Sequence, residues 1–180
     1  MKILLIIIIS ARFSQSLENA DCDKNEAQMK SILRGQYKDV ASYFNGALLS
    51  SIRANIQSPS QNIDCSPLRN LNYLYVTGLM GHLANFVGGS IIIEFRQTYE
   101  INKIKFWMLD DANRIYYIKI FATGADRKTE NLLYQGQVPF GVNTFKFQDQ
   151  FISKLRFYNQ NGNSINQFMS IVKIQAFYEQ

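Results

Sequence analysis

The sequence predicts an all-β protein, an antiparallel β-sandwich that follows a short N-terminal helix. Its hydrophobic content of 47% against 18% charged residues is typical of a globular domain with an ample core. The 13 Phe and 10 Tyr favour pleated, half-buried sheet surfaces. Short runs of alternating apolar and polar residues recur between turn-like segments, which favours two packed sheets over a parallel α/β fold.

The clearest pair of predicted strands lies within residues 102–121. Apolar residues stand at every second position in 104–108 and again in 116–120, with a short polar break between the two runs. A period of two places one side of each strand in the core, and the break predicts a hairpin across which Phe106 and Ile118 face each other. The core positions predicted here are Ile104, Phe106, Met108, Tyr116, Ile118 and Ile120.

Further runs of the same kind complete a sandwich of about eight strands. They cover residues 90–96, 130–135, 143–148, 151–158 and 169–178, with loops expected at 124–127, 136–141 and 159–166. The predicted core residues of these strands are Ile91, Ile93, Phe95, Leu155, Phe157, Val172, Ile174, Ala176 and Tyr178. Lys and Arg residues that alternate with apolar ones are expected on solvated strand faces.

The first 16 residues resemble a secretory signal. Lys2 precedes the apolar run 3–9, small residues follow, and the run is too short to span a bilayer as a helix. This pattern predicts a secreted protein or one of the secretory pathway. The alternative is an intracellular protein whose N-terminus forms a strand or a buried segment. Cys22 and Cys65 would form a disulfide in the first case and remain thiols in the second.

Residues 17–36 form an extension with a predicted helix at 23–35. Asp23 and Glu26 have the spacing of a capping box, and Gly35 can end the helix. Its apolar face consists of Met29, Ile32 and Leu33. So short a helix is marginal in water, so we expect it to pack on the domain, and the alternative is a helix that binds a partner.

Charge and motifs exclude several functions. The net charge of +5 comes from basic residues that are not clustered, so no nucleic acid partner is predicted. The sequence contains no G-x-S-x-G, Walker, C-x-x-C or H-E-x-x-H motif. With His82 as the sole histidine, we predict no metal site, no cofactor and no enzymatic activity, and we expect His82 to be a hydrogen-bonded structural residue. Asp110 and Asp111 are expected to cap a turn, because two adjacent carboxylates are too few for calcium.

Several motifs in residues 37–180 resemble discoidin-like domains, the coagulation factor 5/8 type C or galactose-binding-like family, and most closely those of BTB-domain proteins. The run 39–47 resembles the first strand of the family, and 163–168 is similar to its last loop. Ala112 departs from the family's Arg, and 66–72 lacks its Asp-Gly turn. The other matching residues are Gly78, His82, Gly89, Ser90, Ile91, Trp107, Asp110, Asp111, Tyr116, Tyr117 and Ile118.

The resemblance implies a jelly-roll fold and a non-enzymatic binding module. Such a module would recognise a carbohydrate, a lipid head group or a protein through loops at one end of the barrel, here 53–66 and 73–88. The candidate ligand-binding residues in these loops are Tyr73, Tyr75, His82 and Phe86. The competing interpretation is that the aromatic residues plug the barrel end. In that case a structural subunit of a multi-protein complex, with strand faces and the N-terminal helix as interfaces, becomes the favoured alternative.

Overall fold

A computed structural model of the 180-residue chain describes residues 39–58, 65–69, 81–109 and 112–179. The predicted signal, the predicted helix at 23–35 and the Asp110–Asp111 pair lie outside these residues and stay predictions.

The described chain is built from antiparallel strands, as predicted. No helix among these residues is long and apolar enough to cross a membrane. The elements are the 3₁₀ helices η1 (Tyr43–Asn45) and η2 (Ile52–Ala54) and the strands β1 (Leu48–Leu49), β2 (Ile56–Ser58), β3 (His82–Phe86), β4 (Ser90–Met108), β5 (Ile115–Gly124), β6 (Glu130–Pro139), β7 (Gly141–Asn163) and β8 (Phe168–Phe177).

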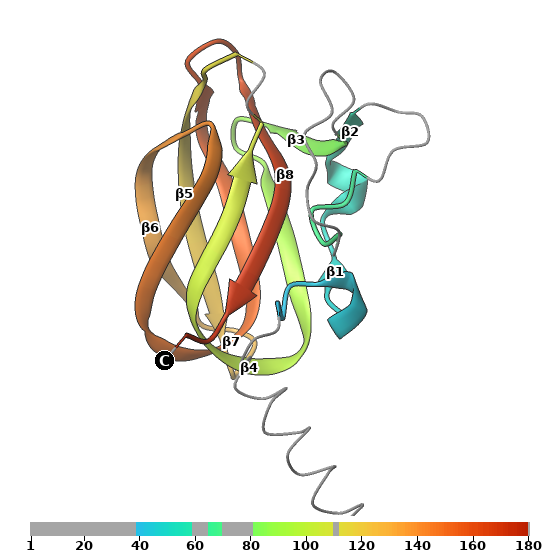
Figure 1. Ribbon diagram of the computed structural model, residues 1–180, viewed down its shortest axis with the longest axis vertical. Helices are drawn as coiled ribbons and strands as arrows, with labels where there is room; N and C mark the ends of the chain where they lie inside the picture. The colour runs from blue at the N-terminus through green and yellow to red at the C-terminus, as the bar shows by residue number, and fades with distance from the viewer. Residues whose placement is uncertain (1–38, 59–64, 70–80, 110–111, 180) are drawn as a thin grey trace, which may run out of the picture.

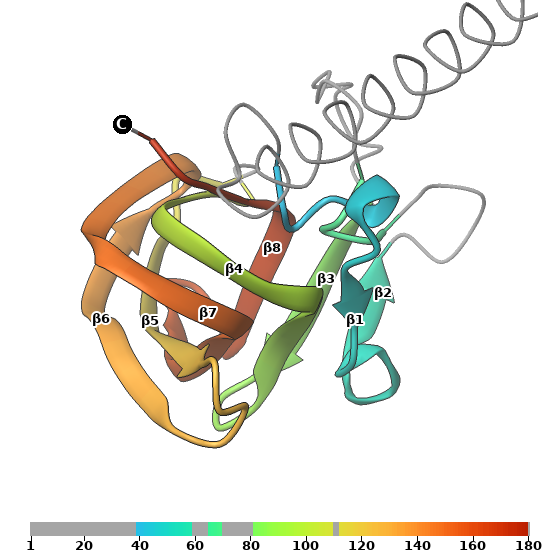
Figure 2. The ribbon, with the colours of Figure 1, turned by 90° about the horizontal axis from the view of Figure 1, so that it is seen from below.

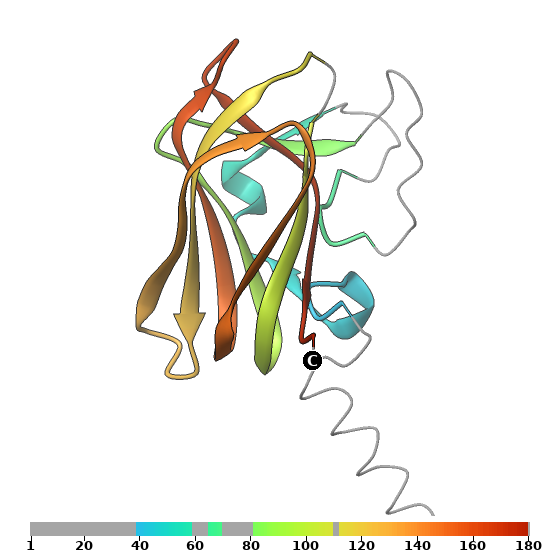
Figure 3. The same cartoon turned by 60° about the vertical axis from the view of Figure 1, so that its left-hand side comes forward.

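Two long strands, β4 and β7, run side by side through both layers of the sandwich (Figures 1 and 3). The strand order is β2-β3-β8-β4-β7-β5-β6, and β1 pairs with the first part of β4. One layer contains β2, β3, β8 and the halves 103–108 of β4 and 141–146 of β7. The other contains β1, β5, β6 and the halves 90–94 and 154–158 of the same two strands. The register shifts between Glu94 and Tyr99, where β4 passes from one layer to the other.

The core lies between the layers and follows the predicted alternation. The predicted core residues of the central strands, and those of 90–96 and 151–158, are all at most 3% exposed. At its centre the ring of Phe106 lies 5.8 Å from that of Phe145 and 5.3 Å from that of Phe157, measured between centroids. These rings come from both halves of β7, so they join the two layers. Viewed along the strands, the sandwich surrounds this core, with β1 and β2 together on the side away from β6 (Figure 2).

The predicted hairpin at 102–121 is wrong in its pairing. Its strands exist and their buried residues are confirmed, but β7 lies between β4 and β5. Phe106 and Ile118 are therefore both fully buried but belong to different layers, and they do not face each other across a hairpin. Alternation determines which side of a strand is buried, and it carries no information on which strand pairs with it.

Several expected loops are strand instead. The runs 143–148 and 151–158 are parts of the single strand β7, which continues to Asn163 into the loop expected at 159–166. β6 continues to Pro139 through most of the loop expected at 136–141. In the same way, 90–96 and the first central run are both parts of β4. Bends and bulges let one strand pass through positions where the alternation is interrupted.

Near the N-terminus the predictions fail in both directions. The run 39–47, expected as a strand, instead forms η1, because the Ser42 hydroxyl accepts a hydrogen bond from the Phe44 N–H and Gly46 ends the turn at φ 76°. The segments expected as loops at 53–67 and 73–89 contain β2 and β3. These strands have three and five residues, too few for a period to be recognised.

Lys173 contradicts the expectation that the strand lysines are solvated. It is 3% exposed and lies on β8, which is buried on both sides over much of its length. The carboxylate of Asp39 is also buried and accepts hydrogen bonds from the N–H groups of Ala41 and Ala176. Burial raises the pKa of Asp39 to about 6, and the attraction of Lys173 and these hydrogen bonds limit the rise.

Candidate functional site: the loop end

Four connections meet at one end of the sandwich, here called the loop end. They are the β3–β4 turn, the described part of the β4–β5 connection, the β6–β7 turn and the β7–β8 loop (Figure 3). The first described residues and the C-terminus lie toward the opposite end (Figure 1). A ligand at the loop end would therefore meet side chains from several separate strands, held by a rigid scaffold.

Asn159 ties two of these connections together, the β3–β4 turn and the β7–β8 loop. Its side-chain N–H groups donate to the carbonyls of Asn85 at 2.8 Å and Gln167 at 3.0 Å, and its side-chain oxygen accepts from the Gly162 N–H at 2.6 Å. Its backbone pairs with the β3–β4 turn through Gly88 and Gly89. Asn159 is fully buried, so these bonds use its hydrogen-bonding capacity without water.

Asn163 shapes the β7–β8 loop itself. Its side-chain oxygen accepts from the N–H groups of Ile165 and Asn166, and its side-chain nitrogen donates to the Phe168 carbonyl at 2.7 Å. Gly162 precedes it at φ 72°, and a Cβ there would lie 2.5 Å from the Asn166 carbonyl oxygen. The loop can therefore form this tight turn only with glycine at that position.

The 51–58 region is fastened to the β3–β4 turn by a second pair of asparagines. Asn55 donates to the Ser90 carbonyl at 3.1 Å, and Asn85 donates to the same carbonyl at 3.2 Å. A Cβ at Gly89 would overlap the Asn85 side chain. Asn55 and Asn85, one from each of the two predicted ligand loops 53–66 and 73–88, are thus brought together next to the loop end.

The loop end exposes apolar side chains on this polar frame. The ring of Phe86 is 53% exposed and lies 4.5 Å from the ring of Phe168, its partner across the β3–β8 pair. The Ile115 carbonyl accepts from the Ser164 N–H, and the Arg114 carbonyl accepts from the Phe140 N–H, which joins the remaining connections. The exposed large apolar residues of this end are Phe86, Val87, Ile115, Phe140 and Ile165.

The predicted ligand-binding residues are divided by the structure. Tyr73 and Tyr75 lie outside the described residues. His82 is half-buried at the start of β3, opposite Ser58, and lies about 13 Å along the strand from Phe86. Of the two described residues, Phe86 lies at the loop end, where it is exposed and not packed into the core.

The described residues include only one of the two cysteines. Cys65 is buried, and Cys22 lies outside the described residues, so their disulfide stays a prediction.

Sequence reasoning did not identify Phe168 and Asn159 as parts of this end. The available signal was the asparagine-rich run N-Q-N-G-N-S-I-N at 159–166, which indicates a loop. It does not indicate which asparagine is buried or which ring stands beside Phe86, because both depend on the pairing of β3 with β8.

A metal site and a catalytic serine each require a particular arrangement of side chains. Within the described ranges, no three His, Cys, Asp or Glu side chains are grouped so that they could hold a metal ion. A polar pocket of about 150 Å³ lies elsewhere, beside the β5–β6 turn, and is lined by Glu94, Arg127, Ser153 and Lys154. The Ser153 hydroxyl donates its proton to the Gly124 carbonyl at 2.8 Å. A nucleophilic serine instead donates to a side chain that acts as a base.

Comparison with known proteins identifies the fold. No protein-family profile and no curated protein matches this sequence. A chitosan-binding module 1 from a chitosanase/glucanase of Paenibacillus sp. IK-5 is similar in structure, with a TM-score of 0.54 and 12% identity over 77% of this chain and 98% of that chain. The family 32 carbohydrate-binding module of NanJ from C. perfringens, in complex with galactose, has a TM-score of 0.51 and 13% identity over 73% and 98%.

A third solved structure, the CBM32 of AlyQ in complex with 4,5-unsaturated mannuronic acid, has a TM-score of 0.50 and 17% identity over 73% of this chain and 99% of that chain. These likenesses confirm the predicted jelly-roll, galactose-binding-like fold. At these identities they show the fold alone, and the closer likeness to BTB-domain proteins stays a prediction.

Proposed function

We propose that this chain is a non-enzymatic module that binds carbohydrate at the loop end. The observation that carries the proposal is the Phe86–Phe168 pair, in which the exposed ring of Phe86 lies 4.5 Å, between centroids, from the half-buried ring of Phe168, next in sequence to the exposed amide side chain of Gln167. Aromatic rings stack on the apolar face of a sugar, and neighbouring polar groups can bond its hydroxyls. The fold shared with carbohydrate-binding modules supports the same function.

A carbohydrate fits this surface better than an anionic lipid surface does. The only charged side chain that the structure describes between 85–90, 112–115, 139–141 and 159–168 is Arg114. The sequence also places Asp110 and Asp111 in the β4–β5 connection, where they would repel an anionic membrane. Attraction to anionic lipids requires clustered Lys and Arg next to the apolar residues.

Replacing Phe86 tests the proposal. We expect Phe86→Ser to lose at least about tenfold in affinity for the sugar that binds, because it removes the stacking surface. Binding is measured by calorimetry with galactose, mannuronate oligosaccharides and chitosan oligosaccharides as separate probes. The matched control is Phe151→Ser, since Phe151 is a similarly exposed phenylalanine, at 57%, in the bend of β7 away from the loop end.

The outcomes separate the candidate ligands. Binding that Phe86→Ser abolishes and Phe151→Ser retains supports the proposal. Equal affinity of both variants for a sugar would place its site elsewhere. If the protein binds none of the sugars but sediments with phosphatidylserine vesicles through Phe86, the ligand is a lipid surface and the carbohydrate proposal is wrong.

A secretory location belongs with this proposal. We infer that the mature chain begins near Leu17 and that Cys22 and Cys65 are joined, because a secretory compartment permits disulfides. N-terminal sequencing and non-reducing peptide mapping of protein from its native source test both points. A chain that keeps Met1 and two thiols would instead favour an intracellular protein.

The alternative function, a subunit of a larger assembly, needs an apolar interface. A described surface suited to that role is the strip of exposed apolar side chains near the N-terminus of the domain.

A further inference from the structure

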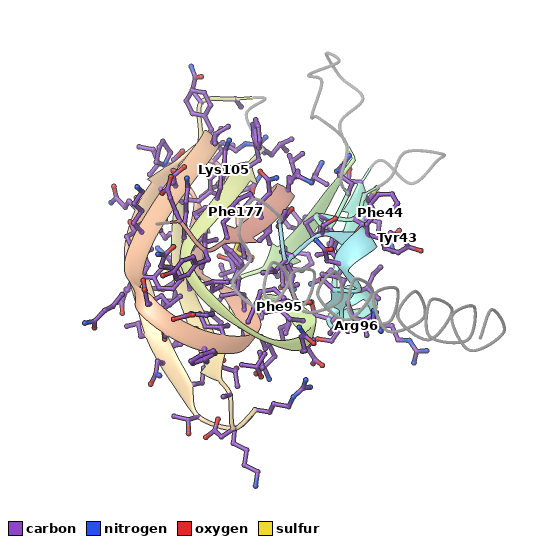
Figure 4. The ribbon with its side chains drawn as sticks, turned by 60° about the horizontal axis from the view of Figure 1, so that its bottom comes forward. Tyr43, Phe44, Phe95, Arg96, Lys105 and Phe177 are labelled. Atoms are coloured by element: carbon purple, nitrogen blue, oxygen red, sulfur yellow. The ribbon has the colours of Figure 1, made fainter. Side chains whose placement is uncertain are left out.

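Apolar side chains project from one edge of the sandwich, where η1, β1, η2 and β2 follow one another. This strip, here called the edge face, consists of Tyr43, Phe44, Leu48, Ile52 and Ile56, which are between 40% and 76% exposed. Figure 4 shows Tyr43 and Phe44 on the outer side of η1, beyond Arg96 and Phe95 of β4. Their rings contact each other edge to face at 5.8 Å.

The backbone holds these side chains outward. The Tyr43 N–H donates to the Leu68 carbonyl at 2.9 Å, and the Ser50 N–H donates to the Ile92 carbonyl at 3.1 Å. The Ser51 hydroxyl accepts from the Ile92 N–H at 2.8 Å. Leu49 packs on the core, so its neighbour Leu48 must point the other way. The η1 and β1 parts of the strip are therefore fastened to residue 68 and to β4, and Leu48 points away from the core.

In the part of the chain that the structure describes, the edge face also borders two sheet edges that have no further partner strand. Among the described strands, β1 pairs only with β4 and β2 only with β3, so each has one free backbone edge. Exposed edges beside exposed apolar side chains are a site of association unless another segment covers them.

We propose that residues 23–35 of the same chain cover the edge face. This segment has an amphipathic pattern, with Met29, Ile32 and Leu33 on one side when it is helical. As a helix it would be about 20 Å long, and the four residue steps from Gly35 to Asp39, the first described residue, can span up to about 13 Å. A helix that ends within about 13 Å of Asp39 can therefore lie along a strip that begins at Tyr43, four residues further on.

Both partners gain from the contact. A helix of this length is marginal alone in water and requires an apolar surface to fold on. The tether holds its local concentration near the millimolar range, so a free partner of similar affinity would have to exceed that concentration to displace it. The inference concerns a different surface from the loop end and does not depend on which ligand binds there.

Hydrogen exchange of the full chain tests the inference. We expect the backbone N–H groups of 26–35 to exchange at least about tenfold more slowly than an unstructured chain, and both Phe44→Ser and Ile32→Asp to remove most of that protection. The double variant should lose no more than either single one, because both remove the same contact. The controls are Phe151→Ser, exposed elsewhere, and Ser31→Asp, on the opposite side of the segment; neither should alter protection.

Three results would overturn the inference. One is unprotected 26–35 in the parent chain. Another is protection that survives both Phe44→Ser and a second edge variant, Leu48→Ser, while β4 and β7 stay protected in both. The third is a dimer in sedimentation that Phe44→Ser converts to a monomer, which would make a second copy of the chain the occupant.

Discussion

Asn159 illustrates how much of the loop end depends on one buried side chain. Three hydrogen bonds from its amide group satisfy backbone groups of β3, the β7–β8 loop and its own turn. The Asn163 amide organises only the loop that follows it, through the N–H groups of Ile165 and Asn166 and the Phe168 carbonyl. The β7–β8 loop beside the aromatic pair Phe86–Phe168 therefore depends on both residues, but of the two side chains only that of Asn159 also bonds β3.

Asn159→Ala should lower the free energy of unfolding by about 2–4 kcal/mol, because it leaves buried backbone groups without partners. Urea denaturation at neutral pH measures the loss. Asn131→Ala, on the exposed face of β6, is the control and should change stability by less than about 0.5 kcal/mol. A loss of the same small size at Asn159 would mean that water replaces its bonds.

At the scale of elements, β8 shows that a strand can be buried on both sides in a two-layer protein. Its edge is covered by coil: the Ile174 N–H donates to the Pro67 carbonyl, and the Val40 N–H donates to the Ala176 carbonyl. The Asp39 carboxylate completes this cover by accepting from the Ala176 N–H at 2.9 Å. An acidic side chain thus performs a structural role in a place where the charged form is disfavoured.

Asp39 should make the protein less stable as the pH rises. Its pKa of about 6 in the folded state exceeds the ordinary value of 3.8, so the folded protein binds the proton more tightly. The resulting stabilisation is complete below about pH 3.8 and is lost as the pH rises through about 6. Relative to the parent, Asp39→Asn should therefore gain about 2–3 kcal/mol in free energy of unfolding between pH 4 and pH 7.

Urea denaturation of both proteins at several pH values measures this difference. Because both proteins contain Glu130 and Glu179, the difference between them does not include the contribution of these residues, which has the opposite sign. Their pKa values are lowered by hydrogen bonds from Arg156 to Glu130 and from Lys146 and Lys103 to Glu179. The control is Asp126→Asn, on the exposed β5–β6 turn. The Asp126 carboxylate has a lowered pKa, because it accepts hydrogen bonds from the Thr129 hydroxyl and from nearby N–H groups. A difference between parent and Asp39→Asn that is constant with pH would contradict the assignment.

At the scale of the whole molecule, the two layers are joined covalently by β4 and β7. Each strand contributes one half to either layer, and the Phe106, Phe145 and Phe157 rings pack between them. One layer cannot unfold without disrupting the strands of the other. The jelly roll should therefore unfold as one cooperative unit.

Phe106→Ala and Ile118→Ala, one in each layer, should each lower the free energy of unfolding by about 2–5 kcal/mol. Both side chains are fully buried, so each truncation leaves a cavity. Circular dichroism and Trp107 fluorescence during denaturation should give the same single transition for either variant. Two separated transitions would show that the layers unfold independently. Phe151→Ala is the control: Phe151 is exposed, so the free energy of unfolding of this variant should lie within about 0.5 kcal/mol of that of the parent.

For the candidate site, sequence and structure contributed different parts. From the asparagine-rich run 159–166 a loop could be predicted, and its part 164–167 does connect β7 to β8; local composition also made Phe86 a candidate contact residue, although it lies in β3 and not in a loop. The ring of Phe168 and the buried amide of Asn159 could not be predicted. They join Phe86 through the pairing of β3 with β8, across more than 70 positions of sequence.

The sequence by itself determined which residues of the long strands face the core. Ile91 and Ile93, and later Leu155 and Phe157, are buried as their alternation predicts, since the two-residue period is a property of the local backbone. Only the tertiary structure decided that β7 separates β4 from β5, that Lys173 and Asp39 are buried, and that the edge face is exposed. Each of these features depends on which strand or segment, distant in sequence, packs next to the residues concerned, and that is determined by the packing of the whole chain.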